Sequence, residues 1–198
     1  MKTALFEMHK LMSRLVLFTV MILCLLFVMQ SVGYAGVAPE GFVGVLWGAS
    51  SEQINKTMRE RGYKKIESNN PDILRFFGTF GSQPCDLSFN LSMNSFYQGT
   101  AYCSQNEQHA TTKWFFELEV KKLSEKYGPP DEQDTRKVEK CTDVCDWAMW
   151  DHLYDNNSNK YSIQALVWRF DTLGGKKSHY TIEYKNESLS EQLKKKAF

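Results

Sequence analysis

The feature that most constrains the fold of this chain is a pair of neighbouring segments, residues 85–91 and 95–103, with the pattern of a β-hairpin. Apolar and polar residues alternate strictly through residues 85–91, which is typical of a strand with one buried face. Residues 95–103 have the composition of its antiparallel partner. Such a hairpin needs other elements to cover its apolar face.

A three-residue loop of Met93, Asn94 and Ser95 sets the register of this hairpin and brings two cysteines together. The facing residues are then Leu91 with Tyr97, Phe89 with Gly99, Leu87 with Ala101, and Cys85 with Cys103. All apolar residues share one side, and the two thiols face each other on adjacent strands at a separation that suits a disulfide. We expect a disulfide here, which contributes about 3 kcal/mol of stability in the chain-entropy model.

The first 35 residues have the pattern of a secretory signal peptide. Basic residues precede an uncharged apolar run over residues 15–29, and Gly33 and Ala35 place small residues at the −3 and −1 positions of a cleavage site. We expect cleavage after Ala35, which leaves residues 36–198 as the exported domain, in the periplasm or outside the cell. The alternative is a membrane anchor over residues 15–35, although its apolar run is short for a span of about 20 residues.

Four cysteines follow this leader, an even number that is typical of two disulfides in an exported chain. With Cys85 and Cys103 paired, Cys141 and Cys145 pair by elimination across a tight turn. The alternative is a metal site made by these last two thiols with neighbouring side chains, namely Asp143, Asp146 and His152. A C-x3-C spacing without a second Cys or His pair is a weak metal signature, so we expect a disulfide, and no metal or other cofactor.

The sequence of the first half of the exported domain predicts a helix followed by strands. An apolar segment over residues 41–47 comes first, and a capping box of Ser50 and Gln53 then begins a helix over residues 51–61, which Gly62 ends. Strand patterns follow at residues 63–67, 73–80, 85–91 and 95–103.

The second half has the same order. Thr111 or Thr112 caps a helix whose apolar stripe consists of Phe116, Val120, Leu123 and Tyr127. Strand patterns follow at residues 136–140, 146–152, 161–170 and 178–185, with a short helix at 188–197. A Gly174-Gly175 turn in the last hairpin places Val167 opposite Ile182 and Ala165 opposite Tyr184.

This order of elements predicts an α+β fold. We expect two units, each a helix followed by antiparallel strands in an αβββ arrangement, over about residues 41–105 and 111–186. The two units share no convincing sequence identity, so the repeat is one of arrangement.

The entry to the first helix reads Phe42-Val43-Gly44-Val45-Leu46-Trp47-Gly48-Ala49-Ser50-Ser51-Glu52-Gln53-Ile54. It resembles the entry segment of small exported bacterial domains. The layout is also similar to the tandem α/β repeat of the β-lactamase-inhibitor-protein type and to small outer-membrane assembly lipoproteins of the SmpA/OmlA type. This resemblance implies a non-catalytic binding or assembly module. The chain lacks the cysteine that those lipoproteins carry at the cleavage point, and no family residue is carried over.

The sequence contains none of the common catalytic or phosphate-binding motifs. We therefore expect a non-catalytic module of the cell envelope that binds a protein or another envelope component. The alternative is a small secreted hydrolase or metal-dependent enzyme that uses acidic and histidine groups near residues 143–152, namely Asp143, Asp146, Asp151 and His152. The net charge of +1 argues against nucleic acid as a partner.

Aromatic residues, 14% of the chain, are the remaining signal of function. Trp147, Trp150 and Trp168 lie on predicted strands and are candidate recognition residues, because binding interfaces favour aromatic anchors. Trp168 is the strongest candidate, since it lies on the strand face opposite to the apolar residues Ile163, Ala165 and Val167. The alternative is that these side chains belong to the core.

The leader gives the first testable prediction. N-terminal sequencing of the exported protein should begin at Gly36, because signal peptidase cleaves after the small residue at −1. A protein that begins at Met1 would instead be anchored by its leader.

Overall fold

The computed structural model describes Met21 and residues 37–105, 109–135, 144–172 and 175–197. The chain divides into two compact units, Met1–Tyr34 and Ala35–Phe198, and every element described below belongs to the second. No helix in these described ranges is both long and apolar enough to cross a bilayer. The predicted cleavage after Ala35 falls outside the described residues and stays a prediction.

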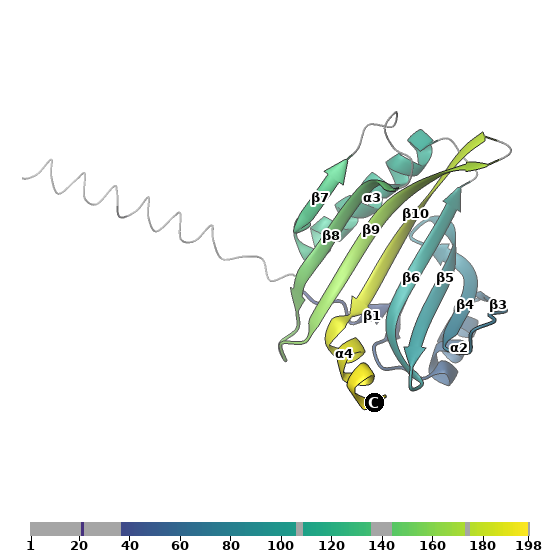
Figure 1. Cartoon of the computed structure of the whole chain (residues 1–198), viewed down its shortest axis with the longest axis vertical. Coiled ribbons are helices and arrows are strands. Elements are labelled where there is room, and N and C mark those ends of the chain that lie inside the picture. The colour runs from purple at the N-terminus through teal and green to yellow at the C-terminus, as the bar shows by residue number, and fades with distance from the viewer. Residues whose placement is uncertain (1–20, 22–36, 106–108, 136–143, 173–174, 198) are drawn as a thin grey trace, which may run out of the picture. The chain divides into compact units, whose positions relative to one another are not determined.

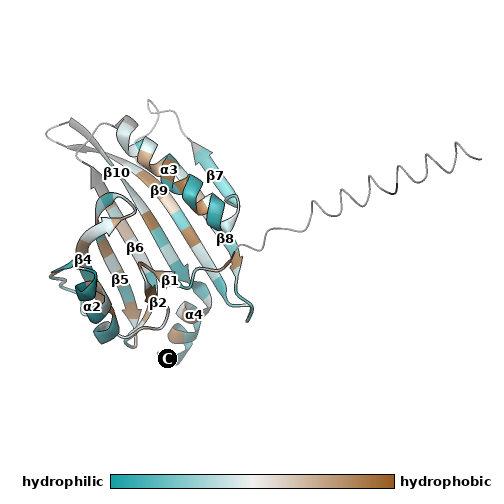
Figure 2. Ribbon diagram, turned by 180° about the vertical axis from the view of Figure 1, so that it is seen from behind, coloured by the Kyte–Doolittle hydropathy of each residue, from teal (hydrophilic) through white to brown (hydrophobic). Residues whose placement is uncertain are grey.

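The fold is α+β, as predicted, and is built around one antiparallel sheet. Its eight strands lie in the order β3-β4-β5-β6-β10-β9-β8-β7, and a separate two-stranded hairpin is formed by β1 (Gly41–Phe42) and β2 (Val45–Leu46). Figure 2 shows the hairpin and the helices α2 and α3 lying across one face of the sheet. Figure 1 looks onto the other face, which they leave open.

The first half contributes one helix and four strands of the sheet. Helix α2 (Ser51–Glu60) begins with the predicted capping box, in which Ser50 Oγ accepts from the amide of Gln53 and the Gln53 side chain accepts from the amide of Ser50. Ile54 and Met58 are its buried residues. The strands are β3 (Lys64–Ile66), β4 (Ile73–Phe80), β5 (Gln83–Ser92) and β6 (Ser95–Gln105).

The second half contributes a longer helix, four strands and a terminal helix. Helix α3 (His109–Tyr127) contacts β8, β9 and β10 through the predicted stripe, which is buried: Phe116, Val120, Leu123 and Tyr127. The strands are β7 (Glu132–Thr135), β8 (Val144–Tyr154), β9 (Lys160–Thr172) and β10 (Gly175–Asn186). Helix α4 (Glu187–Lys196) begins at Asn186, whose side chain accepts from the amide of Leu189.

The β5–β6 hairpin has the predicted register over most of its length but a different turn. Phe89 faces Gly99 and Leu87 faces Ala101, as expected. The turn consists of Met93 and Asn94 alone, both with positive φ, and Ser92 pairs with Ser95. A bulge near Leu91 then restores the expected register. The predicted three-residue loop is therefore wrong, and so is its pairing of Leu91 with Tyr97.

The bulge has a consequence for packing. Leu91 faces Phe96 instead of Tyr97, and Phe96 is fully buried. The structure thus buries Phe96 in the core, where simple alternation from Cys103 would place Tyr97, and Tyr97 is only partly buried.

The predicted register of the β9–β10 hairpin is wrong by two residues. Val167 faces Tyr180 and Ala165 faces Ile182, because Thr172 pairs directly with Gly175. A shift of two residues keeps every side chain on its predicted face. Alternation therefore determined the face of each residue but did not determine its partner.

Two predicted boundaries also differ, and a third cannot be compared. Helix α3 begins at His109, so Thr112 lies inside the helix, where its buried hydroxyl accepts from Ser178 Oγ at 3.1 Å. The apolar segment over residues 41–47 is split into β1 and β2, because Val43 and Gly44 both adopt positive φ. The predicted strand over residues 136–140 lies outside the described residues.

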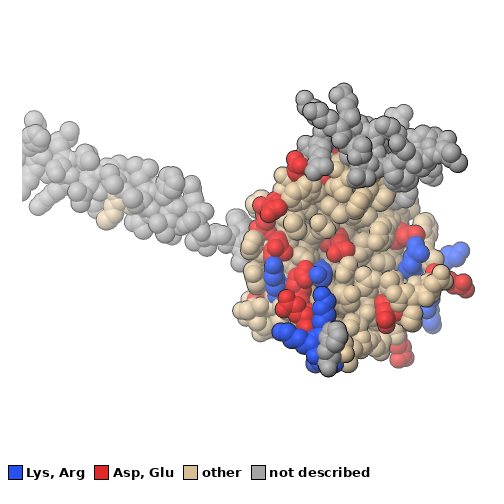
Figure 3. All heavy atoms as spheres, in the orientation of Figure 1, with Lys and Arg blue, Asp and Glu red and all other residues tan. Residues whose placement is uncertain are grey.

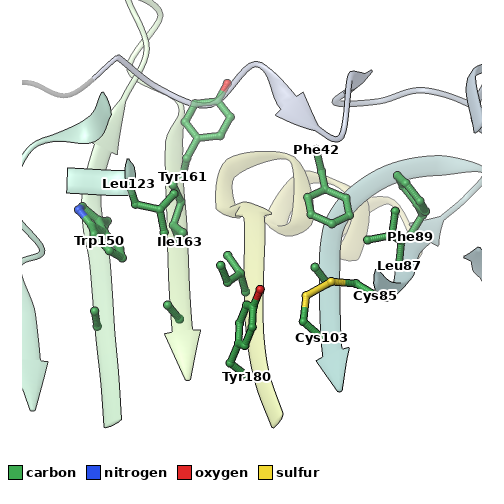
Figure 4. Close-up of a cluster of buried hydrophobic side chains, with 14 of the residues drawn as sticks. Phe42, Cys85, Leu87, Phe89, Cys103, Leu123, Trp150, Tyr161, Ile163 and Tyr180 are labelled. Atoms are coloured by element: carbon green, nitrogen blue, oxygen red, sulfur yellow. A yellow bond between two sulfur atoms is a disulfide. The ribbon is translucent and has the colours of Figure 1, made fainter. Parts of the chain in front are cut away.

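Between the sheet and its cover lies a core rich in aromatic rings (Figure 4). The ring of Phe42 packs on Phe89, with centroids 5.4 Å apart, and Phe89 packs on Phe96 at 5.3 Å. Phe42 is set above Gly99, where a side chain would collide with its ring.

The predicted Cys85–Cys103 disulfide is confirmed, and it lies buried in this core. Cys145 is also buried and disulfide-bonded, but its predicted partner Cys141 lies outside the described residues. Buried disulfides are typical of chains that fold in an oxidising compartment.

The packing of Phe42 against Gly99 can be tested by adding a methyl group at position 99. Gly99→Ala should lower the free energy of unfolding by about 1–3 kcal/mol in urea denaturation, because the new methyl group meets the ring. Phe42→Leu in the same chain should relieve part of this loss, so that the two effects do not add. Strict additivity would mean that the two residues are not in contact.

Candidate functional site

The two faces of the sheet have different residues because side chains alternate along every strand. On β9, Ile163, Ala165 and Val167 are buried beneath the helices, whereas Leu166 and Trp168 on the other face are only partly buried. Figure 3, in the orientation of Figure 1, shows this open face, where large uncharged areas separate the charged side chains.

One row of side chains crosses six strands of the open face. The strand registers place these residues side by side, from β4 to β8: Phe77, Asp86, Tyr102, Thr181, Leu166 and Trp147. We call this set the aromatic row. Phe77 and Tyr102 are about half exposed, at 48% and 47%. Large rings held in the middle of a sheet without a cover are unusual for a face that meets only water.

A second aromatic group lies next to the row. The rings of Trp168 on β9 and His179 on β10 are nearly parallel, with centroids 6.3 Å apart. Trp168 Nε1 donates to Thr181 Oγ1 at 3.2 Å, which orients the indole. Burial lowers the pKa of His179, so its ring is neutral at pH 7.

A hollow of about 530 Å³ lies over β4, β5 and β6. At one side Arg75 Nη2 and Asp86 Oδ2 form an ion pair of 3.1 Å. The remaining lining is mostly uncharged hydrogen-bonding groups, namely Ser88, Asn90, Gln98, Thr100, Tyr102 and His179, with Ile73.

Glu183 lies in the next row of the open face, on the central strand β10. Its cross-strand neighbours are Thr100 on β6 and Gln164 on β9. The Thr100 hydroxyl donates to its carboxylate at 3.5 Å, and the Gln98 side chain also hydrogen-bonds to it. Burial raises the pKa of Glu183 despite these bonds, because the carboxylate is partly withdrawn from water.

The three predicted tryptophans do not lie together. Trp147 and Trp168 lie on the open face, but Trp150 is 1% exposed in the core, where its Nε1 donates to the carbonyl of Gly128 at 2.8 Å. Trp150 is therefore corrected from a recognition residue to a core residue. Residues three apart on a regular strand lie on opposite faces, so Trp147 and Trp150 cannot both be exposed.

Phe77 and Glu183 are site residues that the sequence analysis missed. Their neighbours in the site come from other strands: Phe77 faces Asp86, and Glu183 faces Thr100. These contacts depend on strand pairing, which the sequence analysis did not establish. The sequence signal that could have found them is the alternation of side chains along a strand, because both residues lie on the polar side of their strands.

The groups of the enzyme hypothesis are spread apart by the structure. Asp146 lies on the covered face opposite Val167, 1% exposed, with Lys113 Nζ at 3.6 Å and no hydrogen bond to either carboxylate oxygen. Asp143 lies outside the described residues. Asp146 is thus buried and ion-paired with Lys113 of helix α3.

The other two groups lie near the far end of β8. His152 Nδ1 lies 3.1 Å from Asp131 Oδ1, and Asp151 pairs with Lys160 at 3.3 Å. Burial raises the pKa of Asp131, but hydrogen bonds from Asp151 and His152 outweigh it and lower the pKa overall. Among the described residues no three His, Cys, Asp or Glu side chains gather in a way that could hold a metal ion.

Comparison with known protein families, with curated proteins and with solved structures finds no match for this chain.

The buried Asp146–Lys113 pair gives a test of its structural role. Lys113→Met should lower the free energy of unfolding by about 1–3 kcal/mol, because it leaves the carboxylate of Asp146 buried without a cation. Adding Asp146→Leu to this variant should recover the lost free energy of unfolding, since an apolar pair of similar volume replaces a buried ion pair at little cost. Chemical denaturation of both variants measures this, and a double variant no more stable than Lys113→Met would refute it.

Proposed function

We propose that this protein is a non-catalytic binding module that recognises a partner protein through the open face of its sheet. The observation that carries the proposal is the aromatic row. Its three rings, on β4, β6 and β8, are held in one row by the strand registers, while helices α2 and α3 and the β1–β2 hairpin cover the opposite face. Aromatic side chains on a rigid, partly desolvated surface are typical anchors of protein interfaces.

The size of the open face favours a macromolecule over a small ligand. At a strand spacing of about 4.8 Å, Phe77 and Trp147 lie about 24 Å apart across the sheet. From the row of Lys185 to the row of His179 the face extends about 20 Å along the strands. This footprint is of the same order as one side of a standard protein interface, about 800 Å² of accessible surface.

The chemistry of the face favours protein over the other classes of partner. Its charges include both signs, with Arg75 and Lys185 against Asp86 and Glu183, so it lacks the basic surface that nucleic acid requires. Of the groups of the enzyme hypothesis that the structure describes, Asp146 is buried in the core, whereas Asp151 and His152 lie near the far end of β8.

The order of elements supports a repeated architecture as part of this proposal. Helix α2 precedes β3 to β6, helix α3 precedes β7 to β10, and the last strand of each set, β6 and β10, meets the other at the centre of the sheet. We infer two units of one helix and four strands, in place of the αβββ units expected. The resemblance to exported tandem α/β repeats and export after cleavage at Ala35 belong to the same proposal.

Binding through the open face can be tested by alanine substitution. The exported protein, tagged at its C-terminus, would first capture its partner from an envelope extract of the cells that produce it, and affinity for that partner would then be measured by calorimetry. Phe77→Ala, Tyr102→Ala and Trp147→Ala should each weaken binding by about tenfold or more, the usual effect of removing an aromatic anchor.

A matched control lies on the other side of the molecule. Trp114 on helix α3 is 57% exposed, so Trp114→Ala removes an equally large ring from a surface outside the proposed interface. It should leave the affinity unchanged. Loss of binding with Trp114→Ala, together with full binding by the three open-face variants, would place the interface on the helical side.

A further inference from the structure

Glu183 is an anion at the middle of the proposed interface without a cation of its own. Among the described residues no Lys, Arg or His nitrogen lies within 4.0 Å of its carboxylate. Its nearest basic neighbour on β10, Lys185, pairs instead with Glu187 at 2.7 Å. The carboxylate is therefore hydrogen-bonded by the neutral side chains of Gln98 and Thr100, and Lys185 acts on it only through its charge.

The other basic groups of the open face are fixed at a distance. Arg75 lies in the same row but three strands away, about 14 Å at the usual strand spacing, and is paired with Asp86. His179 lies four residues along β10, about 13 Å away, next to Trp168. Among the described residues, then, Lys185 is the one cation that acts on Glu183, and it does so through charge alone while it is paired with Glu187.

The surroundings of Glu183 suit a planar cation. Tyr102 faces Thr181, two residues from Glu183, so its exposed ring is a diagonal neighbour of the carboxylate. Leu166 is the diagonal neighbour on the other side, from β9. A guanidinium can bind a carboxylate through two parallel hydrogen bonds while its face lies on an aromatic ring, which an ammonium group cannot do.

We propose that Glu183 is the receptor for an arginine side chain of the partner protein, with its guanidinium paired to the carboxylate and stacked against Tyr102. This inference rests on the proposed function and names the chemistry of its central contact. A partly buried carboxylate without a cation destabilises the free protein, and the arriving guanidinium compensates this cost.

Titration of Glu183 supports the same arrangement. The charged and titratable groups around it are Lys185 on β10, Glu187 on α4 and Tyr102 on β6, while its neighbours Gln98, Thr100 and Gln164 are neutral. Because burial raises its pKa, the folded protein holds this proton more tightly than the unfolded chain does. Ionisation above the ordinary Glu pKa therefore removes stability, and the loss is complete above the folded pKa.

The first experiment compares stability with binding in Glu183→Gln. The amide keeps the size of the side chain and removes the charge, so the melting temperature at pH 7 should rise by a few degrees, and this gain should shrink as the pH falls below the ordinary Glu pKa. Affinity for the captured partner should fall about tenfold or more. The matched control is Asp86→Asn, a carboxylate on the same face that already has its cation, Arg75, and it should not raise the melting temperature.

A Glu183→Gln variant that is less stable than the wild type would overturn the inference, because the carboxylate would then serve the fold. Unchanged affinity in this variant would overturn it as well. If affinity is unchanged here but falls in Phe77→Ala and Trp147→Ala, the proposed function stands and only the arginine contact fails.

The second experiment needs no partner. The isotope-labelled protein would be titrated with N-acetyl-arginine amide, and with N-acetyl-citrulline amide as the uncharged probe of the same shape. Arginine amide should shift the NMR signals of Gln98, Tyr102 and Glu183, with little effect from citrulline amide and none in Glu183→Gln. Equal shifts with both probes, or shifts that survive in Glu183→Gln, would show that Glu183 is not a guanidinium site.

Discussion

The structure depends on the one-sided covering of a single antiparallel sheet. Eight strands share one hydrogen-bonded ladder, so each strand presents alternate residues to the same two surfaces. Helix α3 buries its stripe against β8, β9 and β10, and Phe42 of the β1–β2 hairpin packs above Gly99 and Phe89. With the apolar face closed in this way, the residues of the opposite parity lie on the other face of the sheet.

The same constraint explains why rings and charges meet on that outer surface. Tyr102 and Leu166 lie on the open face because their strand neighbours Cys103 and Val167 are buried in the core, and successive side chains point to opposite faces. Central strands shield one another, so small polar groups such as Thr100 and Thr181 are buried even without a cover, and Glu183 between them loses part of its hydration. A carboxylate in that position lowers the stability of the free protein, and this is the reason to regard it as a contact for a partner.

Local patterns predicted most elements because their signals lie within a few residues. The capping box at Ser50, the stripe of α3 and the Cys85–Cys103 pair follow from spacing alone, and the structure confirms them. Errors arose where a hairpin turn sets the register. A two-residue turn at Met93 and Asn94 needs a compensating bulge, and alternation cannot distinguish registers that differ by two residues.

The candidate site was predictable only in part, for a related reason. Parity along β9 placed Trp168 on the face opposite to Val167, and the same rule separates Trp147 from Trp150 on β8. Parity cannot show which strands are neighbours. The pairing of β6 with β10, which joins Tyr102 to Thr181 and Thr100 to Glu183, links residues about eighty positions apart through backbone hydrogen bonds.

By itself, then, the sequence determined the α+β class, most of the residues that face the core, and the central disulfide, because each of these depends on spacing within one helix or one hairpin. The tertiary structure alone decided which strands lie side by side and which face stays uncovered. Those two decisions create the aromatic row and place Glu183 on the open face without an ion pair among the described residues, since both depend on long-range pairing that no local pattern encodes.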